Sequence, residues 1–143
     1  MLVRRRGVAM ATTERWLPDA NTILRYLLGD DPDLSVQAVE FWEAVREGSR
    51  VAFIREGVLL ECVYVLQRFY KVPRAAITEK LRGLLSYKGL VATEGELLDA
   101  SLEFYGRENL DYVDCLLAVR ELRGEGKVFS FDRKLKKVIG KGQ

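Results

Sequence analysis

The stretch at residues 15–28, RWLPDANTILRYLL, decides the fold that we expect for this chain. Trp16 and Leu17 form a short apolar run typical of a buried strand, and Asp19 follows closely after it. The leucines of the second half recur at helical spacing. An aspartate at the carboxyl end of a strand that turns into a helix lies at the edge where open α/β sheets bind ligands. We therefore take Asp19 as the first residue of a functional site.

Short apolar runs alternate with helical patterns along the rest of the chain. The apolar runs predict strands at residues 15–18, 51–54, 90–92 and 128–131. Helical spacing predicts helices at residues 21–28, 33–47, 56–70, 73–87, 94–105, 112–123 and 133–139, with Thr93 as the N-cap of the fifth. This alternation predicts a three-layer α/β/α fold around a central parallel sheet of four to five strands. We expect one domain at residues 15–140, after a basic, disordered extension at residues 1–14.

The composition is typical of a single globular domain. The chain has 143 residues, of which 48% are hydrophobic, enough to bury a core. No run approaches the roughly 18 uninterrupted apolar residues of a membrane span, and no apolar segment of a secretory signal follows the N-terminal arginines. Cys62 and Cys115 lie within apolar helical patterns, which predicts buried thiols rather than a disulfide. We therefore expect a cytoplasmic protein that makes no contact with membranes.

The absence of histidine narrows the possible chemistry. The chain has no His, which excludes a His general base, Ser–His and Cys–His nucleophile pairs, and zinc sites built on imidazole. Two isolated cysteines cannot form a structural zinc site either. An enzyme with this composition would depend on carboxylates that hold a hard, oxygen-binding ion such as Mg²⁺ or Mn²⁺.

The acids that could share one such ion are Asp19, Glu61, Asp114 and Asp132. Asp19 and Asp132 follow predicted strands, and Asp114 lies in the first turn of a predicted helix. Glu61 interrupts an apolar helical run, where we expect it to be buried and in need of a cation. Carboxylates that are packed together repel one another, so such a group is tolerated mainly when a divalent ion neutralises it. A metal held in this way can activate a water for attack on a phosphodiester.

Most of these acids also have a purely structural interpretation. Asp19 and Asp132 could be the N-caps of the helices that follow them. Asp111 and Asp114 have the spacing of an N-cap and a first-turn acid, which is a common helix start. Only one member of this pair need be functional, and we choose Asp114, because it lies within the predicted helix beside Cys115 and two leucines.

Four motifs contain these acids: LPDANTILRYLL at residues 17–28, LLECVYVL at 59–66, LDYVDCLLA at 110–118 and FSFDRKLKK at 129–137. Together they resemble the PIN-domain nucleases, and within them the VapC-type toxins of bacterial and archaeal toxin–antitoxin pairs. The resemblance covers the domain from Trp16 onward. It implies a PIN-like fold and a Mg²⁺- or Mn²⁺-dependent endoribonuclease, often a homodimer, blocked by a cognate antitoxin that occupies the active-site groove.

The resemblance also implies roles for single residues. The acidic metal site of the family falls on Asp19, Glu61, Asp114 and Asp132. Asn21 stands where a small polar residue often follows the first Asp, and Ser130 stands where a hydroxyl would orient an acid. Asp111 departs from the family pattern, because it adds an acid beside Asp114. Our candidates for contacts to the phosphates of RNA are the basic residues Arg25, Arg68, Arg133 and Lys134.

Two other functions remain open at this point. Residues 19–22, DANT, also fit the strand-D-x-x-T pattern of haloacid-dehalogenase-like phosphatases. That chemistry needs a second Asp as general acid where this chain has Asn21. The chain could also be a non-catalytic binding module, because a fold by itself does not prove an activity.

Overall fold

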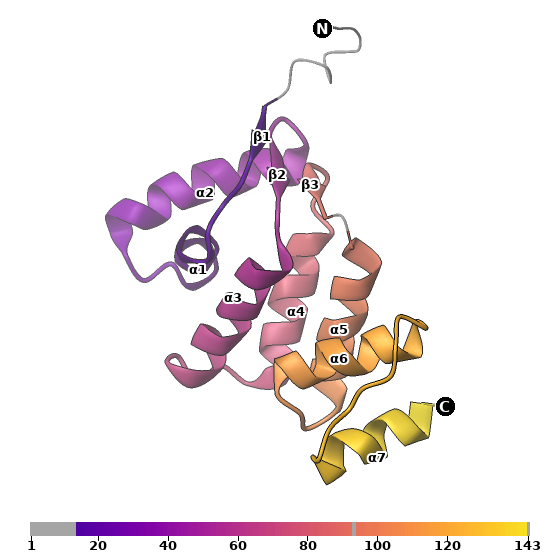
Figure 1. Cartoon of the computed structure of the whole chain (residues 1–143). Coiled ribbons are helices and arrows are strands. Elements are labelled where there is room, and N and C mark those ends of the chain that lie inside the picture. Colours follow the sequence, from indigo (N-terminus) through magenta and orange to yellow (C-terminus); the bar gives the residue numbers. More distant parts are fainter. Residues whose placement is uncertain (1–13, 93, 143) are drawn as a thin grey trace, which may run out of the picture.

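The computed structural model describes residues 14–92 and 94–142. Within these residues, a parallel sheet of three strands lies at one end of the molecule, in the order β1 (Arg15–Trp16), β2 (Val51–Phe53) and β3 (Leu90–Val91) (Figure 1). In the register, Arg15 is opposite Val51, and Phe53 is opposite Val91. Because all strands run in the same direction, they end at one edge of the sheet, and β1 leads there to Asp19.

Helices make up most of the fold. Their bounds are α1 (Ala20–Leu28), α2 (Pro32–Glu47), α3 (Glu56–Arg68), α4 (Arg74–Leu85), α5 (Gly95–Arg107), α6 (Tyr112–Leu122) and α7 (Arg133–Gly142). Every predicted helix is present, and its ends differ from the prediction by no more than three residues. Thr93 and residues 1–13 lie outside the described residues, so the predicted cap and the predicted extension stay predictions.

The helix ends next to the site follow ordinary capping rules. The side chain of Asp19 caps α1, and the side chain of Asp31 caps α2, which begins with a proline. Gly29 and Gly48 end these two helices with φ angles of 63° and 92°. Glycine adopts this left-handed conformation without the steric cost that a Cβ atom would add. The chain therefore turns sharply after α1 and again before β2.

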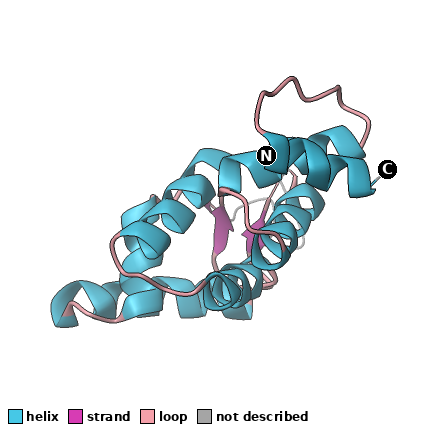
Figure 2. Cartoon of the chain, turned by 90° about the horizontal axis from the view of Figure 1, so that it is seen from below, coloured by secondary structure: helices cyan, strands magenta, loops and turns pink. Residues whose placement is uncertain are grey.

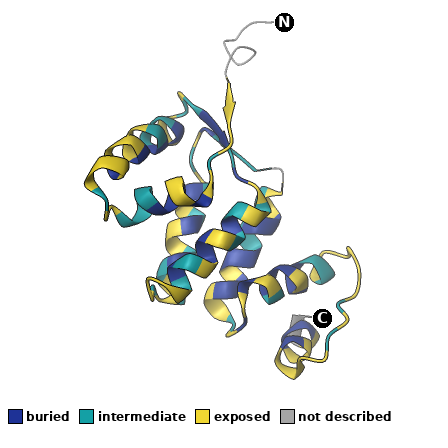
Figure 3. Ribbon diagram, turned by 60° about the vertical axis from the view of Figure 1, so that its left-hand side comes forward, coloured by how far each residue is buried: buried dark blue, intermediate teal, exposed yellow. Residues whose placement is uncertain are grey.

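The helices surround the short strands, as the view from below shows (Figure 2). α1 packs against α2 and α3, while α5 packs against α4 and α6. The buried faces of these helices point inward (Figure 3), and the largest fully buried side chains include Trp42, Leu81, Leu102 and Tyr105. Cys62 and Cys115 are buried free thiols, as the sequence predicts. None of the helices in the described ranges has the length and apolar content required to span a bilayer.

The predicted α/β class is confirmed, but the prediction of a strand at residues 128–131 is wrong. This segment is a loop between α6 and α7, so the sheet within the described residues has fewer than the four to five strands expected. Phe129 and Phe131 are 88% and 86% exposed, and their rings contact each other with centroids 5.4 Å apart. The N–H of Val128 donates to the carboxylate of Glu121 at 2.6 Å. Apolar residues form a strand only where a neighbouring strand covers them, and here none does.

Candidate active site

Asp19 lies in the exposed connection between β1 and α1. Its Oδ1 accepts the backbone N–H of Thr22 at 3.0 Å, and the Thr22 hydroxyl donates to the Asp19 carbonyl oxygen at 2.9 Å. The capping interpretation is therefore correct for one oxygen of this carboxylate. Within the described residues, Oδ2 has no hydrogen-bond donor and remains able to bind a cation.

Glu61 is exposed, so the expectation that it is buried is wrong. α3 buries Leu59, Cys62, Val63 and Leu66, and this stripe turns Glu61 toward solvent. The helical spacing of these buried residues already indicated that Glu61 is exposed, because residue 61 lies outside the apolar face of the helix. The cost of burying a charge consequently gives no argument for a cation at Glu61. Its position beside Asp19 is the argument that remains.

Cys62 links the part of α3 that carries Glu61 to the start of α1, next to Asp19. Its thiol contacts the carbonyl oxygen of Ala20 at 3.9 Å, which joins α3 to the start of α1. Burial raises the pKa of Cys62 to about 12, and the carboxylates of Glu61 and Asp19 add to this effect. We call Asp19 and Glu61 the first acidic group.

A second acidic group consists of Asp111, Asp114 and Asp132. Asp114 is half-buried in the first turn of α6. Burial raises the pKa of Asp114 above its ordinary value, and the negative charges of Asp111 and Asp132 raise it further. No positive charge offsets these causes in the described structure. An uncompensated group of carboxylates is what a divalent cation would stabilise.

Asp132 and Asp111 precede different helices and differ in whether their side chains cap them. Oδ1 of Asp132 accepts the backbone N–H groups of Lys134 and Leu135 at 2.9 and 3.1 Å, so Asp132 is an N-cap. Ser130 accepts the N–H of Asp132 at 2.9 Å through its hydroxyl oxygen. Asp111 occupies the N-cap position of α6 but makes no side-chain cap hydrogen bond. Its carboxylate is therefore not needed to start the helix.

The two acidic groups do not meet in one cluster. Within residues 14–92 and 94–142, no three His, Cys, Asp or Glu side chains lie close enough together to hold a metal ion. The first group lies at the start of α1 and on α3, and the second lies at the starts of α6 and α7. Helix α3 contacts both α1 and α6. The candidate ligands are all carboxylates, which are the donors that Mg²⁺ and Mn²⁺ prefer. Asp19 and Asp132 each cap a helix through one oxygen only, so their second oxygen is left for an ion. The four-carboxylate metal site stays a prediction.

A pocket of about 410 Å³ opens beside Asp19. Asn21 and Arg25 line it together with Asp19, and its apolar walls include Trp16, Leu17 and Phe41. This volume lies within the range of pockets that bind small molecules. The role that the resemblance implies for Asn21 stays a prediction.

The basic residues proposed for RNA differ in their availability. Arg25 forms an ion pair with Asp30 at 2.7 Å and donates to the Tyr70 hydroxyl at 3.0 Å. Lys134 donates through Nζ to the carbonyl oxygen of Asn109 at 3.1 Å. The other two candidates are exposed: Arg133 on α7, and Arg68, whose guanidinium lies 5.5 Å from the Tyr64 ring centroid.

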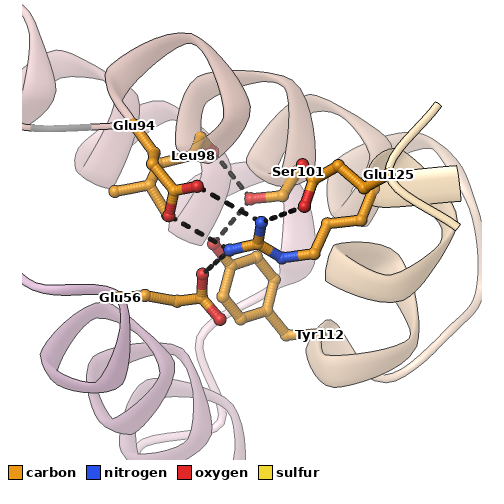
Figure 4. A network of polar contacts seen from close by, with 7 residues as sticks. Glu56, Glu94, Leu98, Ser101, Tyr112 and Glu125 are labelled. Carbon is orange, nitrogen blue, oxygen red and sulfur yellow. Dashed lines mark hydrogen bonds and ion pairs between the residues drawn. The ribbon is translucent and has the colours of Figure 1, made fainter. Parts of the chain in front are cut away.

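Sequence analysis did not predict a second feature, a network around Arg120 at the carboxyl ends of β2 and β3. Figure 4 shows Glu56, Glu94 and Glu125 converging on one guanidinium, beside hydrogen-bonded hydroxyls of Ser101 and Tyr112. Hydrogen bonds from Arg120 lower the pKa of Glu94. Because these acids are already paired with a cation of the protein, they form a structural link between α3, α5 and α6.

Arg74, the first residue of α4, is also absent from the sequence prediction. Its guanidinium donates to the backbone carbonyls of Tyr105, Glu108 and Leu110, and its carbon lies 3.7 Å from the Tyr105 ring centroid. The last of these carbonyls, that of Leu110, directly precedes Asp111. One feature of the sequence points to this role. A positive charge at a helix N-terminus interacts unfavourably with the helix dipole, so Arg74 is expected to bind groups outside its own helix.

Residues 16–141 match the family model described as "PIN domain". A protein named VapC ribonuclease, from Aquifex aeolicus (strain VF5), is 27% identical over 124 residues, which are 85% of this chain and 90% of that protein. No solved structure matches the chain.

Proposed function

Because this chain belongs to the PIN-domain family, we propose that it is a metal-dependent endoribonuclease that acts as the toxin of a toxin–antitoxin pair. Its similarity to a VapC ribonuclease over most of both chains supports RNA as the substrate. The proposal includes a cognate antitoxin as partner, a homodimeric assembly and action in the cytoplasm, where RNA is accessible. The family match favours this activity over a haloacid-dehalogenase-like phosphatase.

The family match over residues 16–141 carries the proposal, and the setting of Asp114 supports it. Asp114 is half-buried, and the carboxylates of Asp111 and Asp132 disfavour its ionised form. A folded protein gains no stability from such an arrangement, whereas a divalent cation would make it favourable. The first acidic group adds exposed carboxylates on the adjoining elements.

We assign the following roles to the residues of this chain. Asp19, Glu61, Asp114 and Asp132 would hold the ion through carboxylate oxygens. Thr22 keeps Asp19 in place from α1, and Ser130 keeps the backbone of Asp132 in place before α7. Mg²⁺ or Mn²⁺, when bound, would neutralise charge and lower the pKa of a bound water. The proposal requires these carboxylates to move closer together on binding, because no three acids of the described residues lie close enough to hold an ion.

The direct test is cleavage of RNA by the purified chain in the presence of Mn²⁺. We expect EDTA to abolish cleavage, and Glu61→Gln to reduce it by about 100-fold or more, because a ligand to the ion is lost. Glu79→Gln is the matched control, since Glu79 is an exposed acid on α4, away from both acidic groups. Cleavage that persists in EDTA, or that Glu61→Gln leaves unchanged, would refute the proposed chemistry.

The biological role needs a separate test. The chain is expressed alone and together with the reading frame next to it in its genome, and cell growth is recorded. We expect growth arrest with the chain alone and recovery with the neighbour. Binding of Mn²⁺ without cleavage of any RNA would instead favour a binding module.

A further inference from the structure

One guanidinium holds the connection between α5 and α6. Arg74 Nε donates to the Tyr105 carbonyl at 3.0 Å, and Nη2 donates to the Glu108 carbonyl at 3.0 Å and to that of Leu110. At a helix end such carbonyls have no partner within the helix and need another donor. The planar fork of arginine can supply several donors in a fixed geometry, which a lysine ammonium cannot do.

The same connection is held from two further elements. Lys134 of α7 donates to the Asn109 carbonyl at 3.1 Å, and the Cys115 thiol of α6 contacts the Leu110 carbonyl at 3.8 Å. Lys134 also donates its backbone N–H to Asp132, at 2.9 Å. The backbone at residues 108–110 is therefore fixed immediately before Asp111, on the side where Asp132 lies.

We propose that Arg74 is a positioning residue for the second acidic group. By holding three carbonyls between Tyr105 and Leu110, it sets where Asp111 and Asp114 present their carboxylates. The side chain of Asp111 makes no cap hydrogen bond, so the direction of its carboxylate depends on how the preceding backbone is held. The inference rests on the proposed function, because it treats these carboxylates as ligands of the metal.

A purely structural role for Arg74 would look different, and α4 offers a matched control. Arg82 lies on the same helix and reaches the same neighbour, α5, where it binds both carboxylate oxygens of Asp99 at 2.8 and 3.0 Å. Removing Arg82 breaks a link between α4 and α5 without touching the 108–111 connection. Effects shared by Arg74→Ala and Arg82→Ala therefore report on helix packing, and effects confined to Arg74→Ala report on positioning.

The experiment compares Arg74→Ala, Arg74→Lys and Arg82→Ala with the wild-type chain. Hydrogen exchange of the amides at residues 108–114 is measured first, then the Mn²⁺ dissociation constant by calorimetry and RNA cleavage at saturating and limiting Mn²⁺. We expect both Arg74 variants to exchange faster in this segment and to bind Mn²⁺ about 10- to 100-fold more weakly, the usual effect of losing a residue that orients metal ligands. Saturating Mn²⁺ should restore much of the cleavage, and Arg82→Ala should match the wild type in all three measurements.

Two results would overturn the inference. One is unchanged exchange at residues 108–114 in Arg74→Lys, which keeps the charge and serves if the alanine variant does not fold. The other is a Mn²⁺ dissociation constant of a folded Arg74 variant equal to that of Arg82→Ala. If the wild-type chain neither binds Mn²⁺ nor cuts RNA, the proposed function fails, and hydrogen exchange alone then decides whether Arg74 orders the segment.

Discussion

Asp19 caps α1, and we propose that binding the metal is its second, separable task. One oxygen of its carboxylate caps α1 through the N–H of Thr22, and the other has no hydrogen-bond donor within the described residues. The sequence allowed either interpretation, capping or metal binding, as though they excluded each other. The geometry allows both at once, because a carboxylate has two oxygens that can face different partners.

Substitutions at Asp19 can separate these tasks. Asparagine caps helices as well as aspartate does, so Asp19→Asn should leave the free energy of unfolding nearly unchanged, whereas Asp19→Ala should reduce it by about 1 kcal/mol. Both variants should lose Mn²⁺ binding and RNA cleavage. Thermal unfolding and calorimetry measure the two effects, and an equal loss of stability in both variants would contradict the capping role.

Asp114 makes the metal-free protein less stable than it could be. Its pKa is raised by burial and by the like charges of Asp111 and Asp132. A carboxyl whose pKa is raised on folding binds its proton more tightly in the folded state. Folding stability from this group is therefore greatest below the pKa of the unfolded chain and declines as the pH rises through the folded-state pKa.

Asp114→Asn should remove this penalty. We expect the metal-free variant to unfold about 1–3 °C above the wild type near pH 7, a shift that corresponds to less than 1 kcal/mol in a domain of this size. The gain should vanish below about pH 3, where the wild-type carboxyl is protonated in both states. Calorimetric scans across this pH range, in the presence of EDTA, make the measurement. A variant less stable than the wild type near pH 7 would show that the carboxylate is not destabilising.

Among the elements, the loop between α6 and α7 differs most from its prediction. Val128, Phe129 and Phe131 have the composition of a strand, yet both phenylalanine rings face solvent. The helix that follows is attached instead by its own buried residues, Leu135, Val138 and Ile139. The strand propensity of these residues therefore does not produce a strand, because no neighbouring strand pairs with this segment.

This arrangement predicts that the exposed rings contribute little to stability. Phe129→Ser and Phe131→Ser should each change the free energy of unfolding by no more than about 0.5 kcal/mol, as other surface substitutions do. Leu135→Ala, on the neighbouring helix, should cost about 2–5 kcal/mol, because Leu135 is 1% exposed. Denaturant titration compares the three variants. A cost for Phe129→Ser as large as that for Leu135→Ala would place residues 128–131 in the core.

Across the whole molecule, α3 connects the parts of the candidate site. It carries Glu61 of the first acidic group and contacts α6, which begins the second. Its N-terminus is also tied to α6 and α5 by Arg120, which binds Glu56, Glu94 and Glu125. The acids at the ends of β2 and β3 are thus paired with Arg120, and the acids near α1 and the start of α6 are the ones that we propose as metal ligands.

The sequence by itself determined the helices, the first three strands and the free buried thiols, and it allowed capping as one interpretation of Asp19 and Asp132. These features depend on periodicity and on hydrogen bonds that span only a few residues. Only the tertiary structure decided that residues 128–131 stay outside the sheet, that no three acids of the described residues come close together, and that Arg74 holds the backbone before Asp111. Those features depend on contacts between residues far apart in the chain, and no local pattern records which distant backbone groups will come within reach of a given side chain.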